Sequence, residues 1–381
     1  MNFLSKAPAP DNQARAERAA GPDLLRIVCM LMILTSHFFV HGKVLGSLRP
    51  TDVNFHIGWF IEGCCYVMVN CFVLITGYYQ SASRFKLKKL LLLWGQIDFT
   101  SAAVYLILCA AKKAVFTLPG FLTAFAAVTG QRYWFATAYI ILYALSPLLN
   151  RALRDLGRRE HLIACAVLWG LFVAGRNLVY WLDFANLHGG YSYTSFIVLY
   201  VTAAYLRKYP PKKRLWLVWY FALSAVAALS RILMTVLFYR FRFGSEYLKM
   251  FMQYNSLPVV AASVCLFLFF LHLNIRGRVS RGLIGFFAPL TFGVYLIHEQ
   301  DELEALIWDT LKLYTHARSP RIWLLLPAVT LSLFLLCSLA DFLRRALSRL
   351  LRVPSLFGWI ADKLGGLGHR LIDRLLPPEE L

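Results

Sequence analysis

Two ionisable side chains near the start of the chain have a spacing that suits chemistry. Arg26 and His37 lie in the apolar segment 22–41, with ten residues between them. Eleven helical steps of about 100° make three turns plus about 20°, so both side chains lie on one helix face, about 16 Å apart along the axis. Histidine exchanges protons near neutral pH, and arginine binds phosphate. The pair therefore indicates a site with a cation at one end and an acid or base at the other.

A second interpretation of these residues is open at this point. An arginine near the end of a membrane span can direct its charge toward the headgroups, and a histidine within a span can be a packed structural residue. The same question applies to His298, which lies about 15 residues into the apolar segment 283–300, as His37 does in 22–41. If both segments run outward, the two histidines lie at similar depth. His298 then orients an acceptor or acts as a second acid or base, unless it only faces the headgroups.

The elements that position these residues must lie in a membrane. Hydrophobic residues make up 59% of the 381 residues, charged residues make up 16%, and the mean hydropathy is +0.57. Soluble domains are about 45–50% apolar and about 25% charged. This composition excludes a soluble enzyme, a disordered chain and a collagen-like rod. The net charge of +20 is typical of nucleic-acid-binding proteins. Here the basic residues lie in short loops between apolar runs, so we expect a membrane-lipid partner and no nucleic acid.

Ten segments are apolar and long enough to predict membrane-spanning helices. Lys and Arg concentrate in the N-terminal tail, the even-numbered loops and the C-terminal tail, with 26 there against 11 in the odd-numbered loops, when Lys88, Lys89 and Arg321 at the starts of segments are counted with the loops before them. Basic loops stay in the cytoplasm. The prediction is an all-α, multi-pass helix bundle in the inner cell membrane, with both termini cytoplasmic. The ten segments are 22–41, 57–80, 87–110, 133–149, 162–182, 190–206, 215–238, 255–275, 283–300 and 321–343.

Three regions follow from this pattern. Residues 1–21 are rich in Ala, Pro and charge and are predicted to form a mobile cytoplasmic tail. Residues 22–343 form the transmembrane domain. Residues 344–381 combine leucines at helical spacing with basic residues, which predicts an amphipathic cytoplasmic tail on the membrane surface, broken by the glycines at 365, 366 and 368. The eight cysteines lie in apolar runs without zinc-like spacing, so we expect buried thiols and no metal site.

Four segments, in order along the chain, resemble acyltransferase family 3. Asp23-Leu24-Leu25-Arg26 followed by His37 is similar to the start of that family. Residues 69–78 (VNCFVLITGY) resemble its aromatic run ending in Ser-Gly-Phe or Ser-Gly-Tyr, although Asn70 and Thr76 stand where members often have Asp and Ser. The other two similar segments are Trp134-Phe135 with Tyr143 and Pro147, and residues 291–298 (TFGVYLIH), which resemble a Tyr-Leu-x-His helix. The resemblance covers roughly residues 20–343.

The resemblance implies an integral membrane enzyme that O-acylates cell-surface carbohydrates. The donor is then cytoplasmic acyl-CoA, with acetyl-CoA expected, and the acceptor is a hydroxyl of an extracytoplasmic or lipid-linked glycan. It assigns the general base to His37, with His298 as a further catalytic candidate. Arg26, with Arg84 and Lys88 after the second span, is expected to bind the phosphates of the donor, and Arg26 also counts among the catalytic candidates. Lys88 stands where some members carry the second arginine of a pair, so we do not expect bidentate phosphate binding at that second position.

For the other ionisable residues the sequence favours structural roles over catalytic ones. Glu62 and Asp98 lie within predicted spans, where we expect buried ion pairs with partners that the sequence does not identify. The acidic residues that follow His298, which are Glu299, Asp301, Glu302 and Glu304, are interpreted as a solvated loop, with a rim for sugar hydroxyls as the alternative.

Two rival functions remain at this stage. A transporter of polysaccharide precursors would place polar groups along a path, but the chain has no paired repeat with broken helices. A glycosyl transferase that uses a lipid-linked sugar would require a longer outer loop with catalytic residues, and no loop has that length.

Overall fold

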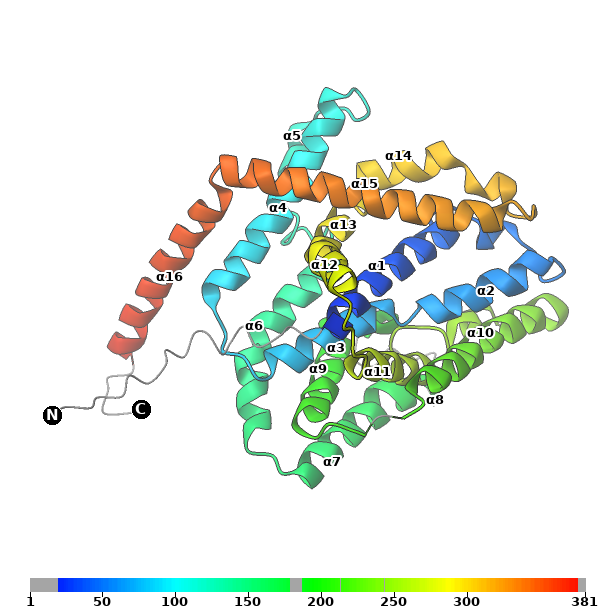
Figure 1. The fold of residues 1–381 in the computed structure, drawn as a ribbon, viewed down its shortest axis with the longest axis horizontal. Helices are drawn as coiled ribbons and strands as arrows, with labels where there is room; N and C mark the ends of the chain where they lie inside the picture. Colours follow the sequence, from blue (N-terminus) through cyan, green and yellow to red (C-terminus); the bar gives the residue numbers. More distant parts are fainter. Residues whose placement is uncertain (1–19, 179–186, 213, 243, 376–381) are drawn as a thin grey trace.

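The computed structural model describes residues 20–178, 187–212, 214–242 and 244–375. Within these ranges the chain is built from helices, with no β-strand (Figure 1). The all-α prediction is therefore confirmed for the described residues. Of the predicted tail 1–21, residues 1–19 lie outside this part of the chain, and Ala20 and Gly21 begin the first helix.

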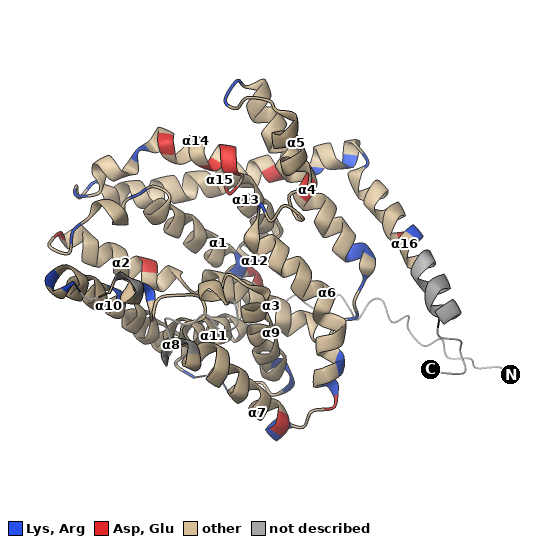
Figure 2. Cartoon of the chain, turned by 180° about the vertical axis from the view of Figure 1, so that it is seen from behind, with Lys and Arg blue, Asp and Glu red and all other residues tan. Residues whose placement is uncertain are grey.

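Six helical stretches are long and apolar enough to cross a membrane among the described residues. They make this a multi-pass membrane protein, in which the charged residues gather toward helix ends and loops (Figure 2). The stretches are α1 (Ala20–Val40) with the turn after it, α2 (Val53–Cys65) with α3 (Met68–Gln80), α4 (Leu87–Ala110), α10 (Trp216–Phe241), α12 (Arg278–Phe287) with α13 (Thr291–His298), and α15 (Ile322–Leu350).

The other four predicted spans correspond to helices that are shorter or less apolar. They are α6 (Trp134–Arg154), α7 (Arg158–Trp169) continuing through a π-helical turn at Gly170–Ala174 into α8 (Gly175–Leu178), α9 (Tyr193–Lys208) and α11 (Leu257–Leu271). The end of the predicted span 162–182 lies beyond the described residues. α11 has 15 residues and α9 has 16, below the length of about 20 that a bilayer requires. The count of ten spans and the cytoplasmic placement of the termini stay predictions.

Three further helices are amphipathic or short: α5 (Leu118–Phe125), α14 (Asp301–Leu311) and α16 (Val353–Leu375). The predicted break at the glycines of the C-terminal tail is wrong, because α16 runs through them. The break lies instead between α15 and α16, where Arg352 has a φ of 55°. α16 packs against α4, and the Phe357 ring lies where a side chain at Gly95 would stand. This packing against α4 stabilises α16 although the helix contains glycines.

The helix that carries Arg26 and His37 occupies the centre of the bundle. α1 packs against α2, α3, α11, α12, α13 and α15, which surround it (Figure 1). Leu25, Cys29, Leu34 and Phe38 on α1 are fully buried. All eight cysteines are free, and six of them are buried as predicted, whereas Cys64 and Cys109 are half-buried. The helix is continuous from Ala20 to Val40, so the position of Arg26 relative to His37 is set by helix geometry alone.

The helix that carries His298 is fastened at both ends. Near its start, the fully buried carboxylate of Asp341 on α15 accepts hydrogen bonds from Arg344 Nε and Arg345 Nε, each at 2.7 Å. Arg345 Nη2 also donates to the Pro289 carbonyl at 2.6 Å, which ties α15 to the turn before α13. Near the end of α13, Tyr133 Oη donates to the Leu296 carbonyl at 2.9 Å. These contacts fix α13 against α6 and α15 and set the position of His298.

Candidate functional site

The two predicted histidines meet in the structure. His37 Nδ1 lies 3.1 Å from His298 Nε2, and the ring centroids are 5.1 Å apart. His37 comes from the last turn of α1, and His298 is the last residue of α13. The expectation that they lie at similar depth is confirmed by this contact. His298 is almost fully buried, whereas the His37 side chain keeps 15% of its surface exposed.

The hydrogen bonds of His298 determine which nitrogen of His37 can accept a proton. His298 Nδ1 lies 2.6 Å from the Val294 carbonyl, which can only accept, so Nδ1 of His298 carries a proton. In the neutral ring, Nε2 of His298 then has the lone pair and accepts from Nδ1–H of His37. The lone pair of His37 is therefore on Nε2, and no described residue hydrogen-bonds to that atom. His37 Nε2 is the available base.

Acidic side chains lie close to His37 and to the neighbouring His41. Glu299 Oε1 lies 3.0 Å from His37 Nδ1 and 3.9 Å from His41 Nε2, and Glu304 Oε1 lies 2.5 Å from His41 Nδ1. The hydrogen bond from His41 holds the pKa of Glu304 below its usual range. A carboxylate beside Nδ1 stabilises the imidazolium that forms when Nε2 takes a proton. Glu299 is thus placed beside the nitrogen of His37 that lies away from the available lone pair on Nε2.

The acidic segment after His298 is not a solvated loop, and that interpretation is wrong. Besides the contacts of Glu299 and Glu304, Arg132 forms ion pairs with Asp301, at 2.9 Å, and with Glu302. The Arg132 side chain is only 4% exposed. The pairing attaches the start of α14 to the segment before α6, since opposite charges removed from water require partners. The acidic residues thus connect the start of α14 both to Arg132 and to the histidines at the end of α1.

Two cavities share His37 as a wall. The first, called the aromatic cavity, has a volume of about 310 Å³ and is lined by α1, α3, α6 and α13 together with Tyr191 and Tyr254. Its lining includes the rings of Phe72, Trp134 and Phe135. Trp134 packs on Tyr191 and Tyr254, with ring centroids at 4.5 Å and 6.0 Å. A narrow, largely apolar space of this kind suits a slender chain more than a highly charged group.

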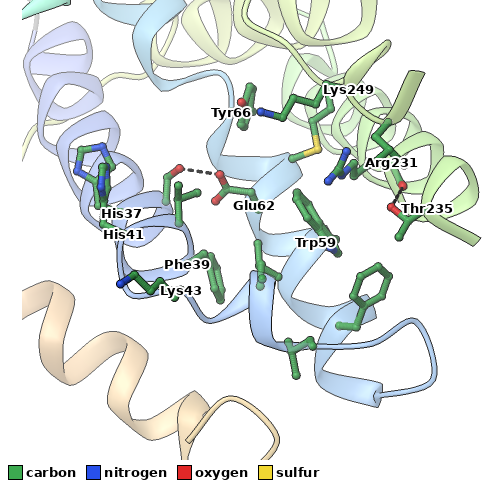
Figure 3. A pocket seen from close by; sticks show the side chains of 18 of the residues that line it. His37, Phe39, His41, Lys43, Trp59, Glu62, Tyr66, Arg231, Thr235 and Lys249 are labelled. Atoms are coloured by element: carbon green, nitrogen blue, oxygen red, sulfur yellow. Dashed lines mark hydrogen bonds between the residues drawn. The ribbon is translucent and has the colours of Figure 1, made fainter. Parts of the chain in front are cut away.

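The second cavity, called the Glu62 cavity, is larger and more polar. Its volume is about 520 Å³, and it shares His37, His41, Tyr191 and Tyr254 with the aromatic cavity. Figure 3 shows its wall, where Glu62 points from α2 toward α1, the helix that carries His37, while Arg231 on α10 lies on the opposite side of Glu62. The Arg231 guanidinium lies over the Trp59 ring, 4.4 Å from the centroid. His37 therefore lies where an apolar space and a polar space meet.

The predicted cation lies at the opposite end of α1. Arg26 lines a third space of about 220 Å³, called the Arg26 cavity, together with Asp23, Thr76, Lys89, Tyr139 and four further residues. Arg26 forms an ion pair with Asp23, one turn before it. The Arg26 cavity and the aromatic cavity lie one turn apart on three helices, at Arg26 and Met30 on α1, at Thr76 and Phe72 on α3, and at Tyr139 and Phe135 on α6. The three spaces thus follow one side of α1, which confirms that Arg26 and His37 share a face.

Two predicted phosphate ligands lie outside the Arg26 cavity. Arg84 is exposed and does not line the cavity. Lys88 Nζ lies 3.5 Å from Asp362 of α16, and its neighbour Lys89 lines the cavity instead. Successive residues of a helix point about 100° apart, so only one of the two lysines can face the cavity. Arg26 and Lys89 are therefore the basic residues that line the Arg26 cavity.

The ion pairs expected for the buried acids are not found in the described part of the chain. Glu62 is fully buried and accepts a hydrogen bond from Ser36 Oγ at 2.6 Å, and Asp98 Oδ1 accepts one from the Val128 amide at 3.1 Å. Hydrogen bonds to neutral donors thus take the place of a cationic partner. The sequence indicates only a structural role for Glu62, but in the structure this residue lines the Glu62 cavity.

Two groups of side chains could hold a metal ion by their spacing. The ligand atoms of His37, His298 and Glu299 lie within 4.8 Å of one another, as do those of His41, Glu299 and Glu304. In the first group the two histidine nitrogens approach each other at 3.1 Å, which a hydrogen bond explains without an ion, and Glu299 Oε1 lies 3.0 Å from His37 Nδ1. The roles of His41, Glu299, Glu304 and Lys89 were missed from the sequence, although His41 lies one turn after His37 and Glu299 directly follows His298.

Comparison with known proteins identifies the family of this chain. A family model described as an acyltransferase domain, that of acyltransferase family 3, matches residues 20–359. No curated protein and no solved structure matches the chain. The matched region contains α1 to α15 with the histidine pair, the three cavities and Arg26. The chain therefore belongs to acyltransferase family 3, as a membrane acyltransferase.

Proposed function

We propose that this membrane enzyme transfers an acyl group, expected to be acetyl, from cytoplasmic acyl-CoA to a hydroxyl of an extracytoplasmic or lipid-linked glycan. The observation that supports it best is the row of three spaces along one side of α1. A cation lines the first space, and a base with an available lone pair lies where the second and third spaces meet. Acyl-CoA has the matching order of parts, with phosphates at one end, a slender arm and a thioester at the other end.

The donor would enter from the Arg26 cavity. Arg26 and Lys89 are the basic residues there, and guanidinium and ammonium groups bind phosphate oxygens. The arm of the donor would pass along α1 through the aromatic cavity and bring the thioester to His37. We infer which side of the membrane the Arg26 end and the His37 end face from the predicted topology, in which the enzyme spans the cell membrane.

The chemical step requires one base that later acts as an acid. His37 Nε2 takes the proton from the acceptor hydroxyl as its oxygen attacks the thioester carbonyl carbon, and a tetrahedral intermediate forms. When that intermediate collapses, the C–S bond breaks, and the sulfur leaves with the proton from Nε2. The products are the acyl ester and CoA with a free thiol, so the proton on His37 is returned. Glu299 and His298 at Nδ1 would stabilise the imidazolium between the two steps.

Purified protein in detergent, incubated with labelled acetyl-CoA and glycans from the cells that make it, tests this proposal. The expected result is release of CoA in equal amount to the label found as ester on glycan. The matched control is His37→Ala, in which both signals should be lost while the protein elutes as a folded species. Transfer of label that persists in His37→Ala would refute the assignment of the base. A wild-type protein that releases no CoA with any glycan would refute the function.

A further inference from the structure

The Glu62 cavity has a feature that the acyl-transfer step does not use. Glu62 is fully buried, and one of its oxygens, Oε1, accepts the hydrogen bond from Ser36. The other oxygen, Oε2, is buried and has no hydrogen-bond partner in the described part of the chain. A buried carboxylate oxygen without a partner is costly, so its retention on a cavity wall indicates that a ligand supplies the donor.

A second unsatisfied group lies one turn away on the same helix. Trp59 and Glu62 are three positions apart on α2, and both line the cavity. The indole Nε1 of Trp59 is buried without a hydrogen-bond partner among the described residues. Figure 3 shows both side chains on α2, with Glu62 pointing toward α1 and the Trp59 ring next to Arg231. One wall therefore presents an acceptor and a donor, which together suit a hydroxyl group, since a hydroxyl can both donate and accept.

The position of the Glu62 carboxylate is fixed relative to His37. Ser36, which fixes Oε1, is the neighbour of His37 on α1, so the hydrogen bond at 2.6 Å links the wall of α2 to the turn that carries the base. A ligand that occupies the cavity can thus place one hydroxyl at His37 Nε2 and another at Glu62 Oε2.

We propose that the Glu62 cavity is the acceptor site, and that Glu62 binds a second hydroxyl of a polyhydroxylated acceptor, a sugar, next to the hydroxyl that is acylated. This inference rests on the proposed function and adds a residue that determines which acceptor binds. Glu62 is a specificity-determining residue here, and the donor side of the site does not involve it.

The test is the separation of the two Michaelis constants in Glu62→Gln. The substitution keeps the size of the side chain and lets the amide oxygen accept from Ser36, but the carboxylate charge is lost. Labelled acetyl-CoA is the donor, and surface polysaccharide purified from the cells that make the protein is the acceptor. A hydrogen bond to a charged group corresponds to about 10- to 150-fold, so kcat/KM for the acceptor should fall by that factor. The KM for acetyl-CoA should stay within about twofold.

The controls separate this inference from the proposed function. Asp98→Asn is a matched change of acid to amide at a residue that lines neither the Glu62 cavity nor the aromatic cavity, so both Michaelis constants should stay near those of the wild type. Failure of the wild type to label any glycan would refute the proposed function. Wild-type labelling together with an unchanged acceptor kcat/KM in Glu62→Gln would refute only the role of Glu62.

A second variant keeps the proposal testable if Glu62→Gln does not fold. Trp59→Phe removes the indole N–H and keeps an aromatic ring beneath Arg231. Its expected effect is a smaller loss of acceptor kcat/KM, about 2- to 12-fold, as for a neutral hydrogen bond, with acetyl-CoA unaffected. Equal losses for donor and acceptor in the variants would show a structural defect and overturn the assignment of the cavity.

Discussion

The contacts of His37 predict an order of activity losses for three substitutions. His37→Gln removes the lone pair of Nε2 and leaves a side chain that hydrogen-bonds but cannot act as a base at neutral pH. A general base contributes about 10²- to 10⁴-fold, so kcat should fall by that factor. The protein should remain folded, since glutamine retains size and polarity at a position that is 15% exposed.

The other two substitutions act through Nδ1 of His37. Glu299→Gln removes the charge that lies 3.0 Å from Nδ1 and stabilises the imidazolium, a loss of about 1.5–3 kcal/mol, or roughly 10- to 150-fold in kcat. His298→Leu removes a neutral acceptor at 3.1 Å, and Glu299 can still hold the Nδ1 proton. A neutral hydrogen bond contributes about 0.5–1.5 kcal/mol, so that loss should be only about 2- to 12-fold.

The assay is kcat for label transfer from acetyl-CoA to glycan, with each variant checked by size-exclusion chromatography. The expected order of loss is His37→Gln first, Glu299→Gln second and His298→Leu third. The variant with both His37→Gln and Glu299→Gln should lose no more than His37→Gln alone, because Glu299 acts only through the base. If His298→Leu were as inactive as His37→Gln, the proton would have to pass through His298, and the assignment of Nε2 as the base would be refuted.

Three other predictions use different parts of the structure. Arg26→Ala should raise the KM for acetyl-CoA by roughly 10- to 150-fold and leave the acceptor KM unchanged, with partial recovery in Arg26→Lys; a change confined to the acceptor would contradict the donor role. A chelator should leave activity intact, because the histidine pair is joined by hydrogen bonds at 3.1 Å, and loss of activity that added zinc restores would show a metal site at His37, His298 and Glu299. On a cysteine-free background, a membrane-impermeant reagent should label a cysteine at Ser47 and not one at Ser83, and labelling at Ser83 in intact cells would invert the topology.

The sequence could predict those parts of the site that depend on one helix. The shared face of Arg26 and His37 follows from helical geometry, and α1 is continuous as that argument requires. The depth of His298 followed from two segments of similar length. The contact between the two histidines at 3.1 Å also required that α13 turn that face toward α1, which only packing determines.

The parts that were missed depend on which helices pack together. Lys88 and Lys89 are neighbours with the same side chain, and α16 covers one of them through Asp362 while the other faces a cavity. Glu62 was interpreted as half of an ion pair because the cost of a buried charge is known, but its actual partner is Ser36 on another helix. Hydrophobic spacing gives the buried face of a helix and does not give the neighbour of each residue.

The uninterrupted helix α1 fixes the distance between Arg26 and His37. Arg26, the proposed anchor for the donor, and His37, the proposed base, lie on one continuous helix, so the distance between them is set by the number of residues and does not depend on how other helices pack. Inserting one residue between them would turn His37 by about 100° and move it by about 1.5 Å, away from both cavities. Inserting four would nearly restore its direction but lengthen the path by about 6 Å, and a donor with an arm of fixed length would then fall short of the base.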